Sequence, residues 1–199
     1  AEYIAKAEFE SKKKIEEEDL HKHLDRITKK VQESNRIIDN LLTYSRLRPP
    51  SREKFNLHDK LGEAVREIRS RRTCTVETLK LEIEPVRDLE ISADPYQLGE
   101  IFSNILNNAS NAIDSEHGEV VIEAHADDGK AIIVIRDNGE GIEKKFLKRV
   151  FDPFFSTRAQ GTGLGLPICR QIIKNHGGSI ELASERGSGT TVTISIPVD

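Results

Sequence analysis

Two consecutive prolines, Pro49 and Pro50, divide the sequence into parts with different hydrophobic periods. Proline has no backbone N–H and clashes with the preceding helical turn, so a helix that reaches this point must stop. Before the prolines, the apolar residues repeat with a helical period. After them, short alternating segments and amphipathic helical segments follow one another. We therefore expect a helical domain over residues 1–50 and a globular domain over residues 51–199.

A long helix from about Asp19 to Arg48 is predicted before the prolines. Its apolar residues follow the a and d positions of about three heptads: Leu20, Leu24, Ile27, Val31, Ile38 and Leu41. One such seam cannot bury itself, so the helix needs a partner, either in a homodimer or in an antiparallel hairpin. In a hairpin, residues 1–10 would end the first helix and residues 11–19 would hold the turn. A lone surface helix packed on the globular domain is the alternative.

The globular part is predicted to be an α+β two-layer α/β sandwich. We expect a mixed, mainly antiparallel sheet with three helices on one face, preceded by the long helix of a truncated helical hairpin. Asp94 and Pro95 have the residue types that open a helix. The expected helices cover residues 57–72, 95–115 and 164–175, and the expected strands cover residues 79–83, 88–93, 120–126, 130–137, 178–185 and 189–198.

Composition excludes several classes of partner. The formal net charge is −4 and 32% of the residues are charged, with both signs interspersed, so no basic footprint for nucleic acid exists. No apolar run is long enough to span a bilayer, and Cys74 and Cys169 lie far apart without metal-ligand spacing. We expect a cytoplasmic protein with reduced thiols and no direct membrane contact. The N-terminus has neither an initiator Met nor a signal peptide, so we expect a fragment of a longer protein.

A stripe of asparagines marks the helix after Asp94. Asn104, Asn108 and Asn111 are spaced four and three residues apart, which places them on one narrow face beside an apolar one. Asparagine is a mediocre helix former, so its repetition needs a reason. Its amide oxygen suits Mg²⁺ and its amide N–H groups can donate to phosphate. A solvated polar face is the alternative.

Asp137 ends a predicted strand and is followed by Gly139 and Gly141. A carboxylate here can accept a hydrogen bond while glycine lets a flat ligand approach the backbone. An ordinary strand-to-loop turn would have the same residues.

The segment STRAQGTGLGL (residues 156–166) matches neither the GxGxxG nor the Walker phosphate template. Backbone N–H groups of residues 161–165 would still open a helix at its N-terminus, which favours an anion. Thr157, Arg158 and Thr162 could add side-chain donors and one positive charge.

Taken in order, the segments QLGEIFSNILNNA, DNGEGI, FDPFF and GTGLGL resemble the N, G1, F and G2 boxes of sensor histidine kinases. These kinases belong to the ATPase group that includes gyrase, heat-shock protein 90 and the mismatch-repair ATPases. The resemblance covers about Phe55 to Pro197, and the short lid, Ser156 to Gln160, is similar to that of the nitrogen-regulatory type. It implies an ATP:protein-L-histidine phosphotransferase of two-component signalling, with ATP and Mg²⁺ as cofactors.

The resemblance also implies roles for individual residues. Asp137 would accept a hydrogen bond from the adenine amino group, and Asn108 would coordinate Mg²⁺. Asn104 and Arg158 would serve catalysis, and Phe151, Phe154 and Phe155 would anchor the lid or simply pack in the core. The implied nucleotide-binding residues are Asn104, Asn108, Asn111, Asp137, Gly139, Gly141, Ile142, Thr157, Arg158, Gly161, Thr162, Gly163, Leu164, Gly165 and Leu166.

One position separates the branches of this group. In the gyrase-like relatives, a Glu one helical turn before the Mg²⁺-binding Asn activates water. Here that position is Asn104, which cannot act as a base, and Glu100 lies a further turn away. This favours phosphoryl transfer over hydrolysis. A stand-alone ATPase and a noncatalytic nucleotide-sensing or dimerisation module remain the alternatives.

The family's acceptor histidine sits in a motif like His-Glu-(x)₃-Pro, and none of the six histidines here has that context. We expect His21 and His23 to be surface residues, and His176 to have no part in the reaction. The acceptor is therefore expected upstream of Ala1. The implied partners are a response-regulator receiver domain and the histidine-bearing hairpin of the intact kinase.

Overall fold

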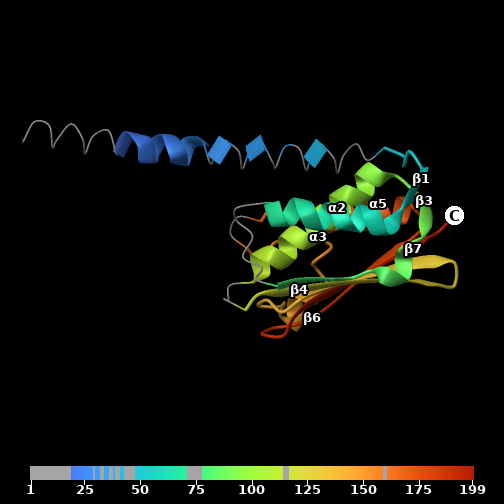
Figure 1. Ribbon diagram of the computed structural model, residues 1–199. Helices are drawn as coiled ribbons and strands as arrows, with labels where there is room; N and C mark the ends of the chain where they lie inside the picture. Colours follow the sequence, from blue (N-terminus) through green and yellow to red (C-terminus); the bar gives the residue numbers. More distant parts are fainter. Residues whose placement is uncertain are drawn as a thin grey trace, which may run out of the picture. The chain divides into compact units, whose positions relative to one another are not determined.

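The computed structural model describes residues 19–28, 30–31, 34–35, 38, 41–42, 48–70, 78–113, 117–158 and 161–199. The chain forms two units, Ala1–Thr43 and Tyr44–Asp199 (Figure 1). Every described residue of the first unit is helical. The first helix of the expected hairpin and its turn lie outside the described residues, as does Cys74. No helix within the described ranges combines the length and apolarity needed to cross a bilayer.

The second unit is built on a mixed five-stranded sheet. Its strands are β2 (Thr78–Glu82), β4 (Glu119–Asp127), β5 (Lys130–Asp137), β6 (Ser179–Glu185) and β7 (Gly189–Pro197). The order is β2-β4-β5-β7-β6, with β2 parallel to β4 and the other pairs antiparallel. The predicted turn between β4 and β5 is confirmed, and both Asp128 (φ 44°) and Gly129 (φ 72°) adopt the left-handed conformation that such a tight turn requires.

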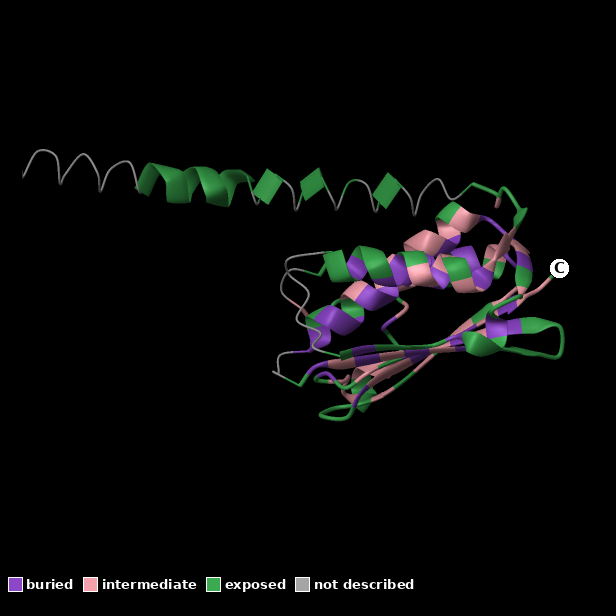
Figure 2. Cartoon of the chain, in the orientation of Figure 1, coloured by how far each residue is buried: buried purple, intermediate pink, exposed green. Residues whose placement is uncertain are grey.

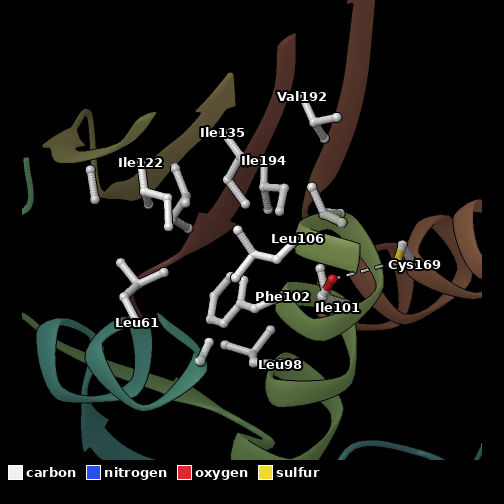
Figure 3. Packing of buried hydrophobic residues seen from close by; sticks show 14 of the residues in the cluster. Leu61, Leu98, Ile101, Phe102, Leu106, Ile122, Ile135, Cys169, Val192 and Ile194 are labelled. Carbon is white, nitrogen blue, oxygen red and sulfur yellow. Dashed lines mark hydrogen bonds between the residues drawn. The ribbon is translucent and has the colours of Figure 1, made fainter. Parts of the chain in front are cut away.

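Three helices cover one face of this sheet (Figure 1): α2 (Leu57–Ser70), α3 (Pro95–Ala112) and α5 (Gly165–Asn175). Buried residues recur along all three helices, as the colouring in Figure 2 shows, and they belong to the same hydrophobic cluster as the buried residues of the strands. Phe102 of α3 lies at the centre of the core with Leu61 of α2 and Ile122 and Ile194 of the sheet, all at most 1% exposed (Figure 3). The predicted α+β two-layer sandwich is confirmed.

Three short elements were not predicted from the sequence. β1 (Glu53–Asn56) pairs antiparallel with β3 (Glu90–Ala93) in a separate two-stranded sheet. A 3₁₀ turn, η1 (Glu84–Val86), and a four-residue helix, α4 (Lys144–Leu147), complete the fold. The β1–β3 pair joins segments that are far apart in the sequence, so local hydrophobic alternation carries no sign of it.

The helix boundaries differ from the prediction where tertiary contacts or proline intervene. Asp94 caps α3 as predicted, because its Oδ1 accepts from the N–H groups of Tyr96 and Gln97 at 3.0 Å each. The helix was expected to continue to Ser115 but ends at Ala112, whose carbonyl accepts instead from the N–H of Glu140 at 2.9 Å. Arg48 was expected to be helical and is not, because it precedes a proline.

Candidate nucleotide-binding site

The asparagine stripe lies along one edge of α3. Asn104 is half-buried, whereas Asn108 and Asn111 are exposed. The neighbouring Ile101 and Ile105 are buried against the core, at 0% and 2% exposure. The helical spacing therefore turns the amide groups out of the core, with Asn104 deepest.

The N-terminus of α5 abuts Asn104. A Cβ atom built on Gly165 would lie 3.4 Å from Asn104 Oδ1, an ordinary van der Waals distance, so the start of α5 lies against the Asn104 side chain. The helices also pack at Cys169, whose Sγ lies 3.9 Å from the carbonyl oxygen of Ile101 (Figure 3). Burial raises the pKa of the Cys169 thiol, which is an inert packing group here. The structure thus places the glycine segment and the asparagine stripe side by side.

Asp137 is held at the end of β5 with one carboxylate oxygen already used. Oδ1 accepts from the N–H of Gly139 at 3.0 Å and from the N–H of Thr190 at 3.2 Å. No donor among the described residues reaches Oδ2. Burial raises the pKa of Asp137, and the two N–H groups and the Arg158 charge oppose this rise. The carboxylate is therefore oriented, partly desolvated and able to accept one more hydrogen bond.

Arg158 connects the lid to both of these elements. Its Nη1 and Nη2 donate to the carbonyl oxygen of Asn108, each at 3.3 Å. Its Nε lies 3.6 Å from Glu140 Oε1, in the turn that follows Asp137. One guanidinium group therefore lies between α3 and the Asp137 turn, where it would be available to an anion.

Gly139 and Gly141 are needed for close approach of the backbone to itself. A Cβ on Gly139 would lie 2.5 Å from the carbonyl oxygen of Ala112. Gly141 has φ 65°, and a Cβ there would clash with the carbonyl oxygen of Glu185. These glycines therefore fix the Asp137 turn against α3 and β6. Their predicted contact with a ligand stays a prediction.

The FDPFF segment holds the lid through its backbone. Phe154 N–H donates to the carbonyl oxygen of Gly163 at 3.0 Å, and a Cβ on Gly163 would lie 2.4 Å from the Phe154 carbonyl carbon. The Phe154 ring is 65% exposed, with φ 64°, so it does not pack in the core. Phe155 is half-buried and contacts Phe146, with 5.6 Å between the ring centroids.

The described contacts link Asn104, Asn108, Asp137, Arg158 and Gly165 into one region. Other predicted residues make different contacts: Asn111 and Thr157 are exposed, the N–H of Ile142 donates to Ser184 Oγ at 2.8 Å, and Thr162 Oγ1 accepts from the N–H of the buried Leu164 at 3.4 Å. Gly161 is exposed and Leu166 is half-buried, and both stay predictions as nucleotide contacts. Glu140 and Thr190 were not predicted as site residues, because their roles depend on where the lid lies and on the β5–β7 register.

The donor set fits Mg²⁺ brought in with a nucleotide. Mg²⁺ keeps several waters and takes phosphate oxygens together with one or two protein oxygens. The Asn108 side chain is exposed, and its amide oxygen is a neutral hard ligand of this kind. Asn108 could hold the ion with nucleotide phosphates, and the ion would then neutralise their charge.

Known proteins resemble this chain in both sequence and fold. The chain is 35% identical over 182 residues to "Signal transduction histidine-protein kinase AtoS" of Escherichia coli (strain K12), covering 89% of this chain and 29% of that protein. The solved catalytic domain of histidine kinase ThkA, in a nucleotide-free form, superposes with a TM-score of 0.66 at 29% identity, covering 74% of this chain and 96% of that one. ThkA in complex with the response regulator protein TrrA gives a TM-score of 0.75 at 27% identity, covering 90% and 52%.

The sequence profile of one family matches residues 93–199, which contain the asparagine stripe, Asp137, Arg158 and the lid glycines. The chain spans less than a third of the length of AtoS. The profile covers more than half of this chain, and the resemblance seen in the sequence is confirmed. The chain belongs to the histidine kinase-, DNA gyrase B- and HSP90-like ATPase family.

Proposed function

We propose that this chain is the ATP-binding catalytic core of a sensor histidine kinase. It would bind MgATP with residues 51–199 and transfer the γ-phosphate to a histidine of a helical hairpin, for relay to a response-regulator aspartate. Residues 1–50 would form part of that hairpin and a homodimer contact. The family membership and the similarity to the histidine kinases AtoS and ThkA support this assignment. The ThkA–TrrA complex supports the response regulator as partner.

The observation that carries the proposal is the meeting of three elements around Arg158. The guanidinium donates to the carbonyl of Asn108 at 3.3 Å and lies 3.6 Å from Glu140, next to the turn of Asp137. In the proposed complex, Asp137 Oδ2 accepts from the adenine amino group. The phosphates extend along the asparagine stripe toward Gly165, where the N-terminus of α5 favours negative charge.

The residue type at position 104 favours transfer over hydrolysis. In transfer, a histidine ring nitrogen attacks the γ-phosphorus, the bond from that phosphorus to the β–γ bridging oxygen breaks, and ADP leaves with the electron pair. The ring proton passes to solvent. A hydrolase of this group needs a base at this position, and the Asn104 amide cannot act as one. Arg158 and the Mg²⁺ held by Asn108 would stabilise the charge of the transferring group.

Two measurements on the full chain test this function. Calorimetry should show ATP binding that is strengthened by Mg²⁺. Incubation with γ-labelled ATP and a histidine-bearing hairpin supplied in trans should place acid-labile, base-stable label on the hairpin. Asp137→Asn should weaken both signals strongly. Release of inorganic phosphate without labelled hairpin would instead assign a stand-alone ATPase, and binding without either reaction would assign a nucleotide-sensing module.

A further inference from the structure

The chain immediately after Pro50 is fastened to the ends of two helices. Ser51 N–H donates to Asp94 Oδ2 at 3.0 Å, which ties the chain to the N-cap of α3. Arg52 Nη2 donates to the carbonyl oxygen of His176 at 3.2 Å, at the C-cap of α5, and its Nη1 reaches the carbonyl oxygen of Ser92 at 3.4 Å. We call Ser51, Arg52, Asp94 and His176 the linker clasp.

His176 joins the two helix ends directly. Its side chain is 0% exposed, and both ring nitrogens are used. Nδ1 lies 2.8 Å from the carbonyl oxygen of Ile172, which can only accept, and the N–H of Asp94, which can only donate, lies 3.0 Å from Nε2. These partners fix the neutral Nδ1–H tautomer. A buried ring with this donor and acceptor pattern holds α5 to α3 at one orientation.

The clasp and the nucleotide region lie at opposite ends of the same helix pair. α3 runs from Asp94 at the clasp to Asn104, about 15 Å along the axis at 1.5 Å per residue. α5 runs from Gly165 to His176 at the clasp, about 16 Å at the same rise. The helices are therefore antiparallel, with the clasp at one end and the contact between Gly165 and Asn104 toward the other.

We propose that His176 is a positioning residue, and that the linker acts through it to hold α5 in register with α3 for phosphate binding. The inference rests on the proposed ATP site. The exposed Arg52 donates to two carbonyl groups, and one of them belongs to His176 itself. Loss of the clasp lets the N-terminus of α5 shift against the asparagine stripe. Affinity for the triphosphate then falls, while the adenine contact at Asp137, on β5, keeps its geometry.

The test compares MgATP and adenosine binding to the full chain by calorimetry. Arg52→Gln should raise the Kd for MgATP about three- to tenfold and leave the Kd for adenosine within twofold of the unsubstituted chain. Ser51→Pro, which removes the N–H donated to Asp94, should act in the same direction. Arg87→Gln is the matched control, because that arginine pairs on the surface with Glu84 at 3.2 Å and should change neither Kd.

His176 itself is tested by a conservative and a disruptive change. His176→Gln keeps an acceptor for the Asp94 N–H and should bind MgATP more tightly than His176→Leu, which removes both ring hydrogen bonds. If His176→Leu does not fold, the positioning role is tested by Arg52→Gln and Ser51→Pro. Because coupling is reciprocal, MgATP should also slow hydrogen exchange at the Ser51 amide, which a merely structural clasp would not show.

The possible outcomes separate this inference from the proposed function. The positioning role is wrong if both Arg52→Gln and Ser51→Pro keep a Kd for MgATP within twofold of that of the unsubstituted chain. It is also wrong if they raise the Kd for adenosine as much as the Kd for MgATP. In either case the proposed ATP site stands. If the unsubstituted chain binds no ATP, the proposed function is overturned, and the inference with it.

Discussion

The two units of the chain bury their apolar residues very differently. In the first unit, Leu24 and Ile27 are 50% and 59% exposed, although their heptad spacing is that of a packed helix. In the second unit, Phe102 and Ile133 are 0% exposed. A core that closes on itself makes the second unit independent of any partner. A helix with an exposed apolar seam depends on another helix for its stability.

The largest difference between the units should appear in stability. Phe102→Ala removes a fully buried ring and should lower the free energy of unfolding of the second unit by about 3–5 kcal/mol. Leu24→Ala, on the exposed seam, should change the same transition by less than about 0.5 kcal/mol. Differential scanning calorimetry of the full chain measures both. Equal losses would show that the units do not fold independently.

A second test separates ligand binding from stability within the second unit. Asp137→Asn replaces the free carboxylate acceptor by an amide N–H donor. This donor would face the adenine amino group, which is also a donor, so ATP binding should weaken by about 100-fold. Burial raises the pKa of Asp137, so the folded state disfavours its charge, and the neutral Asn should leave the unliganded unit at least as stable. Calorimetry gives the affinity and thermal unfolding gives the stability. If Asp137→Asn loses stability but keeps its ATP affinity, Asp137 is not the acceptor for adenine.

Much of the fold and of the candidate site could be predicted from the sequence, because it depends on local features. The α3 cap at Asp94, the asparagine stripe and the strand ending at Asp137 depend on local spacing and local residue chemistry. The pairing of Arg158 with Glu140 could not be predicted, because it depends on where the lid lies. His176 was expected to be a bystander, and its buried contact with the N–H of Asp94 arises from tertiary packing that local spacing does not reveal.

The pH dependence of binding should show a smaller effect with a defined sign. Asp137 must be ionised to accept from adenine, so ATP affinity should fall as the pH drops through its raised pKa, by up to about tenfold per pH unit once most molecules are protonated. The folded unit holds this proton more tightly than the unfolded chain does. The same protonation therefore contributes to the stability of the unliganded unit as the pH falls.

Calorimetric titrations at a series of pH values from neutral downward give the affinity, and Asp137→Asn supplies the reference without this titration. A pH profile of the residual binding that is the same in the two proteins would show that another group is responsible.

The smallest effect on the second unit should come from the seam of the first. Ile27→Glu places a charge in the exposed apolar stripe and should weaken self-association of the chain, measured by sedimentation velocity. The Kd for MgATP should stay within twofold, because that site belongs to the second unit. A large loss of ATP affinity would show that the helix contributes to the site.

The central claim is that the asparagine stripe of α3 forms the Mg²⁺ and phosphate side of an ATP site. Asn108 tests it directly, since its side chain is exposed and its replacement leaves the core intact. Calorimetry with and without Mg²⁺ should show that Mg²⁺ strengthens ATP binding to the unsubstituted chain and to an Asn107→Ala control. Asn108→Ala should lose this Mg²⁺ dependence and at least tenfold in MgATP affinity. Unchanged, Mg²⁺-dependent binding by Asn108→Ala would contradict it.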